Sequence, residues 1–239
     1  MQLNDDLYVL ALTFVREGQS MPLNLSLLVD PVNGPTLVDA GLPGQQDEIA
    51  GEMAGAGVQV QQLKRIVLTH QDIDHVGSLA SLARTSGAEV LAHEIEAPFI
   101  DGRSTPRFAT PEVLARRPEM KAVADRLRPT PVDGVLQDGD RLDVSGGVRV
   151  VATPGHTIGH ICLYLERTRT LVAGDALSAR EGKLLGPLES ATQDMRTASA
   201  SVRKLAGMDV ETIVCYHGGV VTDDATGQLR RVAAELAEP

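Results

Sequence analysis

The sequence predicts an α/β protein, because short apolar runs typical of strands alternate with stretches of helical periodicity along most of the chain. Several of the apolar runs end directly at a histidine or an aspartate, which is typical of strands that carry a functional site at their ends. The sequence has no internal repeat, no low-complexity segment and no convincing domain boundary. We therefore expect a single domain over residues 1–239.

Strands are predicted where aliphatic residues cluster between turn signals, and helices where apolar residues recur with helical spacing. In chain order the predicted strands are residues 7–15, 23–29, 35–39, 65–69, 89–92, 148–153, 160–165, 169–173 and 211–216. The predicted helices are residues 45–56, 75–85, 195–205 and 224–237. The last of these is amphipathic and closes the chain.

The segment 98–131 differs from the rest of the chain in composition, with six prolines, many arginines and only a short helical patch at 119–127. Long irregular segments in compact domains are usually functional, so we expect a flexible excursion or a lid. Its Phe99 and Phe108, together with several arginines, are expected to frame a pocket for a small, partly apolar anion. These arginines are Arg103, Arg107, Arg116 and Arg117.

The composition excludes several classes of protein. A formal charge of −10 and a pI near 5.0 argue against nucleic acid or an anionic membrane as the main partner. No apolar run is long enough for a transmembrane helix, and the acidic N-terminus lacks the basic start of a signal peptide, so a cytoplasmic location is expected. Cys162 and Cys215 lie in apolar runs and are expected to be small buried residues rather than a disulfide.

The strongest functional signal is the loop that follows residues 66–68, where four candidate metal donors lie within six residues. They are His70, Asp72, Asp74 and His75. Imidazole and carboxylate groups mixed on one loop suit zinc, manganese or iron. The alternative interpretation, a polar loop that caps a helix, does not account for the donors found later in the chain.

Three further donors follow predicted strands in the second half of the chain. His156 comes after Pro154 and Gly155, Asp175 after Gly174, and His217 directly after residues 213–216. Strand ends held by a rigid sheet are where α/β proteins build sites, so these donors are expected to converge with those of the first loop. Turn chemistry around the glycines is the alternative for each position taken alone.

The order of these motifs resembles the metallo-β-lactamase fold superfamily. The matching segments are T-H-x-x-x-D-H-x-G at 69–77, T-P-G-H-T-x-G-H at 153–160, A-G-D at 173–175, Y-H-G at 216–218 and the early L-V-D-A-G at 37–41. The resemblance covers nearly the whole chain. It implies a four-layer αβ/βα sandwich with a dinuclear metal site along one edge.

The resemblance also implies roles for individual residues. One metal ion would be bound by His70, Asp72 and His156, and a second by Asp74, His75 and His217, with Asp175 as the bridge between them. Asp39 would orient one of the ligands, and His160 would support the site without binding metal. His93 matches no ligand position and is expected to make hydrogen bonds near Glu96.

The sequence departs from the family at Asp72, because the usual motif H-x-H-x-D-H has histidine there. An oxygen donor makes the first site harder and moves its preference from zinc toward manganese or iron. We expect two divalent metal ions, with zinc first and manganese or iron as the alternatives.

The resemblance implies metal-dependent hydrolysis by a hydroxide held between the two ions, with Asp74 orienting the nucleophile. The leading hypothesis is a cytoplasmic hydrolase of a small-molecule ester, lactone or thioester. The alternatives are an iron-dependent thiol or persulfide oxygenase, a phosphodiester hydrolase, and a binding protein that has lost catalysis. A small molecule is the expected partner, with no nucleic acid and no membrane. The oligomeric state is open, with a homodimer as one option.

Overall fold

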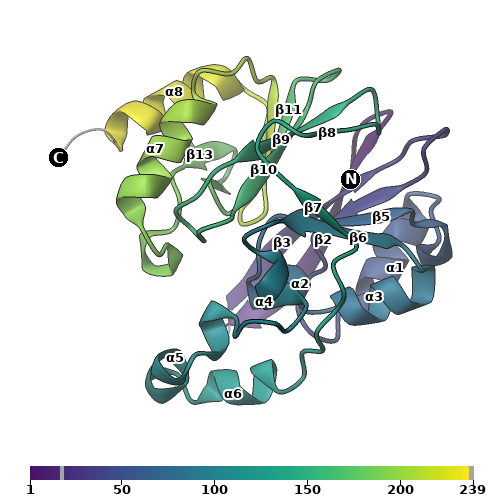
Figure 1. Ribbon diagram of the computed structural model, residues 1–239. Helices are drawn as coiled ribbons and strands as arrows, with labels where there is room; N and C mark the ends of the chain where they lie inside the picture. Colours follow the sequence, from purple (N-terminus) through teal and green to yellow (C-terminus); the bar gives the residue numbers. More distant parts are fainter. Residues whose placement is uncertain (17–18, 237–239) are drawn as a thin grey trace. The chain divides into compact units, whose positions relative to one another are not determined.

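The computed structural model describes residues 1–16 and 19–236, and its secondary structure is α/β with two mixed sheets and a separate hairpin (Figure 1). Contacts between Cα atoms divide the chain into two compact units. The first contains Met1–Leu10 and Leu27–Leu136, and the second contains Ala11–Ser26 and Gln137–Pro239. The expected single domain over residues 1–239 stays a prediction.

The first sheet has seven strands in sequence order. They are β1 (Gln2–Asn4), β2 (Leu7–Arg16), β3 (Gln19–Leu28), β4 (Thr36–Val38), β5 (Arg65–Leu68), β6 (Glu89–His93) and β7 (Gly134–Leu136). Strands β4 to β7 are parallel, whereas β1 and β2 pair antiparallel. Ile66, Val67 and Leu68 of β5 are fully buried, as expected for a central parallel strand, so the residues that follow β5 start from a rigid base.

Helices α1 (Gln46–Gly55), α2 (Ile73–Val76) and α3 (Leu79–Ser86) belong to the first unit. The single helix predicted at 75–85 is wrong in detail, because the structure has two helices that separate at Gly77 and Ser78. The turn at 40–43 packs against this point. A Cβ atom at Gly77 would lie 2.2 Å from the backbone nitrogen of Pro43, and the Gly77 N–H donates to the Gly41 carbonyl at 2.8 Å.

The segment 98–131 contains more regular structure than the sequence predicts. It starts within α4 (Ala97–Ile100) and continues through the 3₁₀ turn η2 (Arg107–Ala109), α5 (Pro111–Arg116) and α6 (Glu119–Ala124) (Figure 1). Only α6 corresponds to the predicted helical patch. The prolines caused the error, since proline is favoured at the first position of a helix, and Pro111 starts α5 with the Thr110 hydroxyl accepting from the Val113 N–H.

The second unit contains a six-stranded mixed sheet. In sheet order its strands are β15 (Gly219–Val221), β14 (Thr212–Cys215), β11 (Thr170–Gly174), β10 (Ile161–Leu165), β9 (Val148–Ala152) and β8 (Arg141–Leu142), and β12 (Ser178–Arg180) pairs with β13 (Lys183–Leu185) outside it. Helices α7 (Met195–Leu205) and α8 (Ala225–Glu235) lie side by side and contribute Val202 and Leu229 to a core shared with the sheet (Figure 1). This core holds the ends of β9, β11 and β14 in place.

The two cysteines are buried and free, which confirms the expectation drawn from the sequence. Cys162 lies on β10, where its thiol donates to the Ala173 carbonyl at 3.3 Å. Burial raises the pKa of the Cys162 thiol to about 12 and also raises the pKa of Cys215.

We predict that neither thiol reacts with iodoacetamide at pH 8 in the native protein, because almost no reactive thiolate is present and both sulfur atoms are enclosed. Mass spectrometry of intact protein should show no added group under native conditions and two after unfolding in guanidinium chloride. Labelling of the native protein at the rate of free cysteine would contradict the burial of these residues.

Among residues 1–16 and 19–236, no helix has both the length and the apolar character that crossing a bilayer requires.

Candidate functional site

In the first unit the candidate donors lie on the loop after β5, and a network around Asp39 holds this loop. Asp39 follows β4 in the left-handed region, with φ of 66°. Its Oδ1 accepts from the Thr69 N–H at 2.8 Å, and the Thr69 hydroxyl lies within 3.0 Å of both carboxylate oxygens. The adjacent strands β4 and β5 therefore fix the start of the donor loop.

The same network orients His75. Asp39 Oδ2 lies 2.9 Å from Nδ1 of His75, which is fully buried. A histidine that donates from one ring nitrogen to a carboxylate is left with the other nitrogen as a metal ligand. In this geometry Nε2 of His75 is the candidate donor atom, 3.8 Å from Asp74 Oδ2.

Asp72 has a partner that the sequence does not predict. The guanidinium of Arg107, on η2, donates from Nε to Asp72 Oδ1 at 2.6 Å and from Nη2 to Asp72 Oδ2. The Arg107 backbone N–H also donates to the Gln71 side chain at 2.9 Å. Asp72 Oδ2 is nevertheless 3.4 Å from Nε2 of His70, so the carboxylate lies beside a candidate ligand while paired to an arginine.

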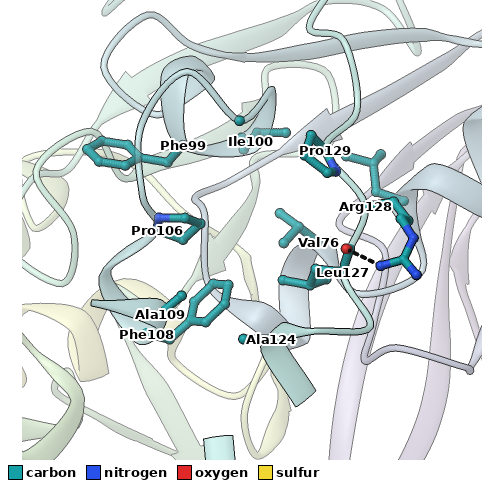
Figure 2. A pocket seen from close by; sticks show the side chains of 12 residues that line it. Val76, Phe99, Ile100, Pro106, Phe108, Ala109, Ala124, Leu127, Arg128 and Pro129 are labelled. Carbon is teal, nitrogen blue, oxygen red and sulfur yellow. Dashed lines mark hydrogen bonds between the residues drawn. The ribbon is translucent and has the colours of Figure 1, made fainter. Parts of the chain in front are cut away.

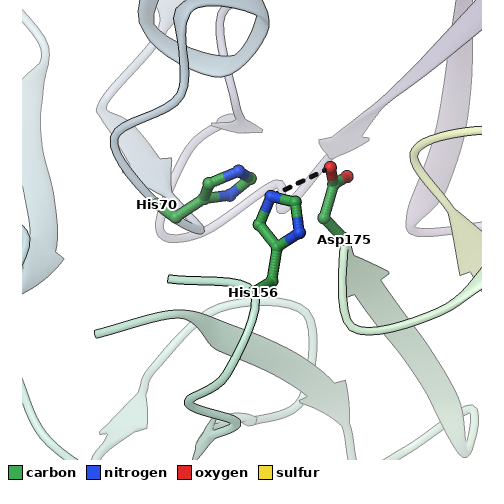
Figure 3. A group of neighbouring side chains, drawn as sticks. All are labelled: His70, His156 and Asp175. Atoms are coloured by element: carbon green, nitrogen blue, oxygen red, sulfur yellow. Dashed lines mark ion pairs between the residues drawn. The ribbon is translucent and has the colours of Figure 1, made fainter. Parts of the chain in front are cut away.

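In the second unit, His156, Asp175 and His217 follow β9, β11 and β14 as predicted from the sequence. Figure 3 shows the side chains of His156 and Asp175 turned toward each other. Asp175 Oδ2 is 3.4 Å from Nε2 of His156 and 3.4 Å from Nε2 of His217. One oxygen atom is thus equally distant from two imidazoles.

These separations are informative because they are too long for hydrogen bonds, which span about 2.7–3.2 Å between heavy atoms. Two ligand atoms bound to one tetrahedral ion at about 2.0–2.1 Å are about 3.4 Å apart. The spacing of Asp175 from His156 and His217, and of His70 from Asp72, is therefore compatible with ligands around a metal ion.

The ring of His160 makes hydrogen bonds with the backbone of Asp175 and with Thr153. Its Nε2 accepts from the Asp175 backbone N–H at 3.0 Å, and its Nδ1 lies 2.8 Å from the Thr153 hydroxyl. His93 is buried, its Nδ1 accepts from the Ile95 N–H, and its carbonyl accepts from the Glu96 N–H.

Each unit, among the described residues, supplies donors that a metal ion accepts: His70, Asp74 and His75 in the first unit, and His156, Asp175 and His217 in the second. Their nitrogen and oxygen atoms are the donors that zinc, manganese and iron accept, so the donor chemistry fits the expected ions. The Asp72 carboxylate, which is paired with Arg107, is not among these donors in the part of the chain that the structure describes. The predicted assignment of ligands to individual metal ions, the bridging role of Asp175 and the supporting roles of Asp39 and His160 stay predictions.

Sequence reasoning missed Arg107 as the partner of Asp72, although it noted the arginines of 98–131. Three of these arginines are paired with acids: Arg107 with Asp72, Arg103 with Asp101 and Arg117 with Glu119. The role of Thr69 was also missed. The signal that could have indicated this role is the position of the Thr69 hydroxyl directly before His70 in the sequence.

The fold and the donors define a class of α/β proteins with histidine and aspartate metal sites at strand ends. A family model described as the metallo-beta-lactamase superfamily matches residues 23–217, and this chain belongs to that superfamily. The match confirms the resemblance that the motifs suggested. It also confirms the predicted fold class, in agreement with solved structures of the same fold.

Relatives and solved structures agree with this assignment. The chain is 32% identical over 199 residues to the probable metallo-hydrolase YflN of Bacillus subtilis, covering 76% of this chain and 74% of the relative. It is 28% identical over 187 residues to a hydroxyacylglutathione hydrolase of Rhizobium meliloti, covering 74% of this chain but only 60% of that relative. A metallo-beta-lactamase family protein of Thermus thermophilus, TTHA1429, matches with 28% identity and a TM-score of 0.76, covering 98% of this chain and 79% of that one.

Proposed function

We propose that this protein is a metal-dependent hydrolase that cleaves a small-molecule ester, lactone or thioester. The observation that carries this proposal is the position of Asp175 Oδ2, 3.4 Å from Nε2 of both His156 and His217. A carboxylate oxygen so placed suits a bridge between two divalent ions. Two such ions supply a water of lowered pKa and polarise a carbonyl, which is the chemistry that hydrolysis needs.

The chain's own residues would position the reactants. We propose that His70 and His156 hold one ion, that Asp74, His75 and His217 hold the other, and that Asp175 is shared. Asp39 keeps the His75 ring in its orientation through Nδ1. Asp74, which is only partly buried, would orient the attacking water and carry a proton to the leaving group.

The names of the relatives support a hydrolase, and some of them also support a thioester as the substrate. The Bacillus relative is named a probable metallo-hydrolase, and several others are named hydroxyacylglutathione hydrolases. Because this chain spans about 60% of the length of the Rhizobium enzyme, thioester cleavage stands beside ester and lactone cleavage in the proposal. The formal charge of −10 favours a small molecule over a nucleic acid as the partner.

The proposal is tested on protein purified without chelators and loaded in turn with zinc, manganese or iron. Substrates are p-nitrophenyl esters, aliphatic lactones, S-acylglutathiones and, for phosphodiester cleavage, bis-p-nitrophenyl phosphate. We expect turnover of a carboxylic substrate at least about 100-fold above an Asp175→Asn variant, since that change removes the shared anion. Arg103→Gln is the control, because Arg103 is exposed and pairs only locally with Asp101.

Failure of every ester, lactone and thioester to react faster than the Asp175→Asn background would refute the proposal. The iron-dependent oxygenase predicts a different outcome, with one iron per chain and oxygen consumption on adding glutathione persulfide. Metal content per chain therefore separates the two hypotheses.

A further inference from the structure

The first unit contains a cavity of about 170 Å³ under the segment 97–131 (Figure 2). Helices α2 and α3 contribute one side of it, and α4, η2, α6 and residues 127–129 contribute the rest. Its apolar lining includes Val76, Leu79, Phe99, Ile100, Phe108 and Leu127. Both aromatic residues that the sequence predicts for a pocket therefore line this one, but none of the four predicted arginines does.

The lining of this cavity is mainly apolar, which suits an apolar group better than an anion. Arg128 is the charged residue of the lining, and its Nη1 donates to the carbonyls of Asp125 and Leu127 at 2.8 and 2.9 Å. Figure 2 shows the Arg128 side chain at the edge of the group, beside Leu127. The expected pocket for an anion is thus corrected to a pocket for an apolar group.

The cavity adjoins the donor loop at two points of the chain. Val76, which lines it, directly follows His75, and Phe108, which also lines it, directly follows Arg107. Arg107 pairs with Asp72 and its backbone donates to Gln71, so η2 is fastened to the donor loop while presenting Phe108 to the cavity. A molecule with its apolar end here lies next to the loop that carries the metal donors.

The size of the cavity limits its occupant. A cavity of roughly 150 Å³ lined by Leu, Ile and Phe side chains stays dry and binds benzene. A space of about 170 Å³ lined by Phe99, Phe108, Leu127 and their neighbours thus accommodates about six carbon atoms.

We propose that this cavity binds the apolar end of the substrate, a phenyl ring or an acyl chain of about six carbons. The proposal rests on the proposed function in naming the group as part of an ester, lactone or thioester. Acetyl and lactoyl groups are too small to fill the space, and a long acyl chain is too large for it.

The first experiment compares substrates that share a leaving group. The kcat/KM of wild-type protein for hexanoyl and phenylacetyl thioesters of one thiol is expected to exceed that for the acetyl thioester by at least about tenfold, since each buried CH₂ contributes severalfold in binding. Ala124→Leu, which extends a lining residue of α6 into the cavity, should remove this preference by lowering kcat/KM for the hexanoyl and phenylacetyl substrates. Ala122→Leu is the matched control, because Ala122 is exposed on the same helix.

The second experiment needs no turnover. Toluene is added to ¹³C-methyl-labelled protein, and we expect saturable shifts of the Val76, Ile100 and Leu127 methyl signals that Ala124→Leu abolishes and Ala122→Leu retains. Toluene binding without hydrolysis of any panel substrate would support the cavity and refute the proposed function. Hydrolysis with equal kcat/KM for acetyl and hexanoyl substrates and no toluene shifts would refute the cavity proposal and leave the function intact.

Discussion

Replacing Asp175 with alanine is expected to reduce bound metal from two ions per chain to one or none. Asp175 Oδ2 is 3.4 Å from Nε2 of both His156 and His217, so the substitution takes one ligand from each proposed ion. Changing a residue that only supports a ligand costs about 10–100-fold in metal affinity, and removing a shared ligand should cost more than about 100-fold. The measurement is metal content per chain by mass spectrometry after purification without chelators.

His93→Ala is the control for this prediction. His93 is also a buried histidine, but its side chain accepts from the Ile95 N–H, so its loss should leave two ions in place. Two ions retained in the Asp175→Ala variant would rule out the bridging assignment. Loss of metal from the His93 variant, with the fold intact by circular dichroism, would mean that the ligand list is wrong.

Replacing Arg107 with glutamine is expected to tighten metal binding about tenfold. Arg107 holds Asp72 with two charge-assisted hydrogen bonds, and the pair is only partly exposed. The substitution releases a carboxylate that lies 3.4 Å from Nε2 of His70 and removes a positive charge near the bound cation. Both changes favour a cation. Competition with a chromophoric chelator gives the affinity directly.

Arg103→Gln is the matched control, because it removes the same charge from the same segment and disrupts only an exposed pair with Asp101. Its metal affinity should stay within about twofold of wild type. Weaker metal binding by Arg107→Gln would show the opposite role for the arginine, namely that it positions Asp72 as a ligand.

The parts of the fold that depend on local sequence pattern were predictable. The helix α7 has the predicted bounds, and β9 to β11 and β14 differ from the predicted strands by one residue at either end or less. The break of the predicted helix 75–85 was not predictable from local pattern, because it depends on the turn at 40–43 packing against Gly77. The short helices of 97–124 were obscured by proline, which starts some helices and ends others.

The candidate donors were predictable for a different reason. Each follows an apolar strand, so its position in the sequence identifies it as a candidate without knowledge of its contacts. The partners of the donors were harder to predict. Arg107 is separated from Asp72 by 35 residues, and nothing in its neighbours distinguishes it from Arg103, which forms an exposed pair instead.

The backbone of Asp39 narrows the substitutions that its position tolerates. With φ of 66° the residue favours glycine, asparagine and aspartate, since the left-handed region is costly for most side chains. Its carboxylate must also reach Thr69 and His75. Glycine satisfies the backbone but offers no acceptor, glutamate offers an acceptor but strains the backbone, and asparagine lacks the charge. The backbone conformation and the contacts of the side chain thus both constrain this position, and aspartate is the residue that meets both requirements.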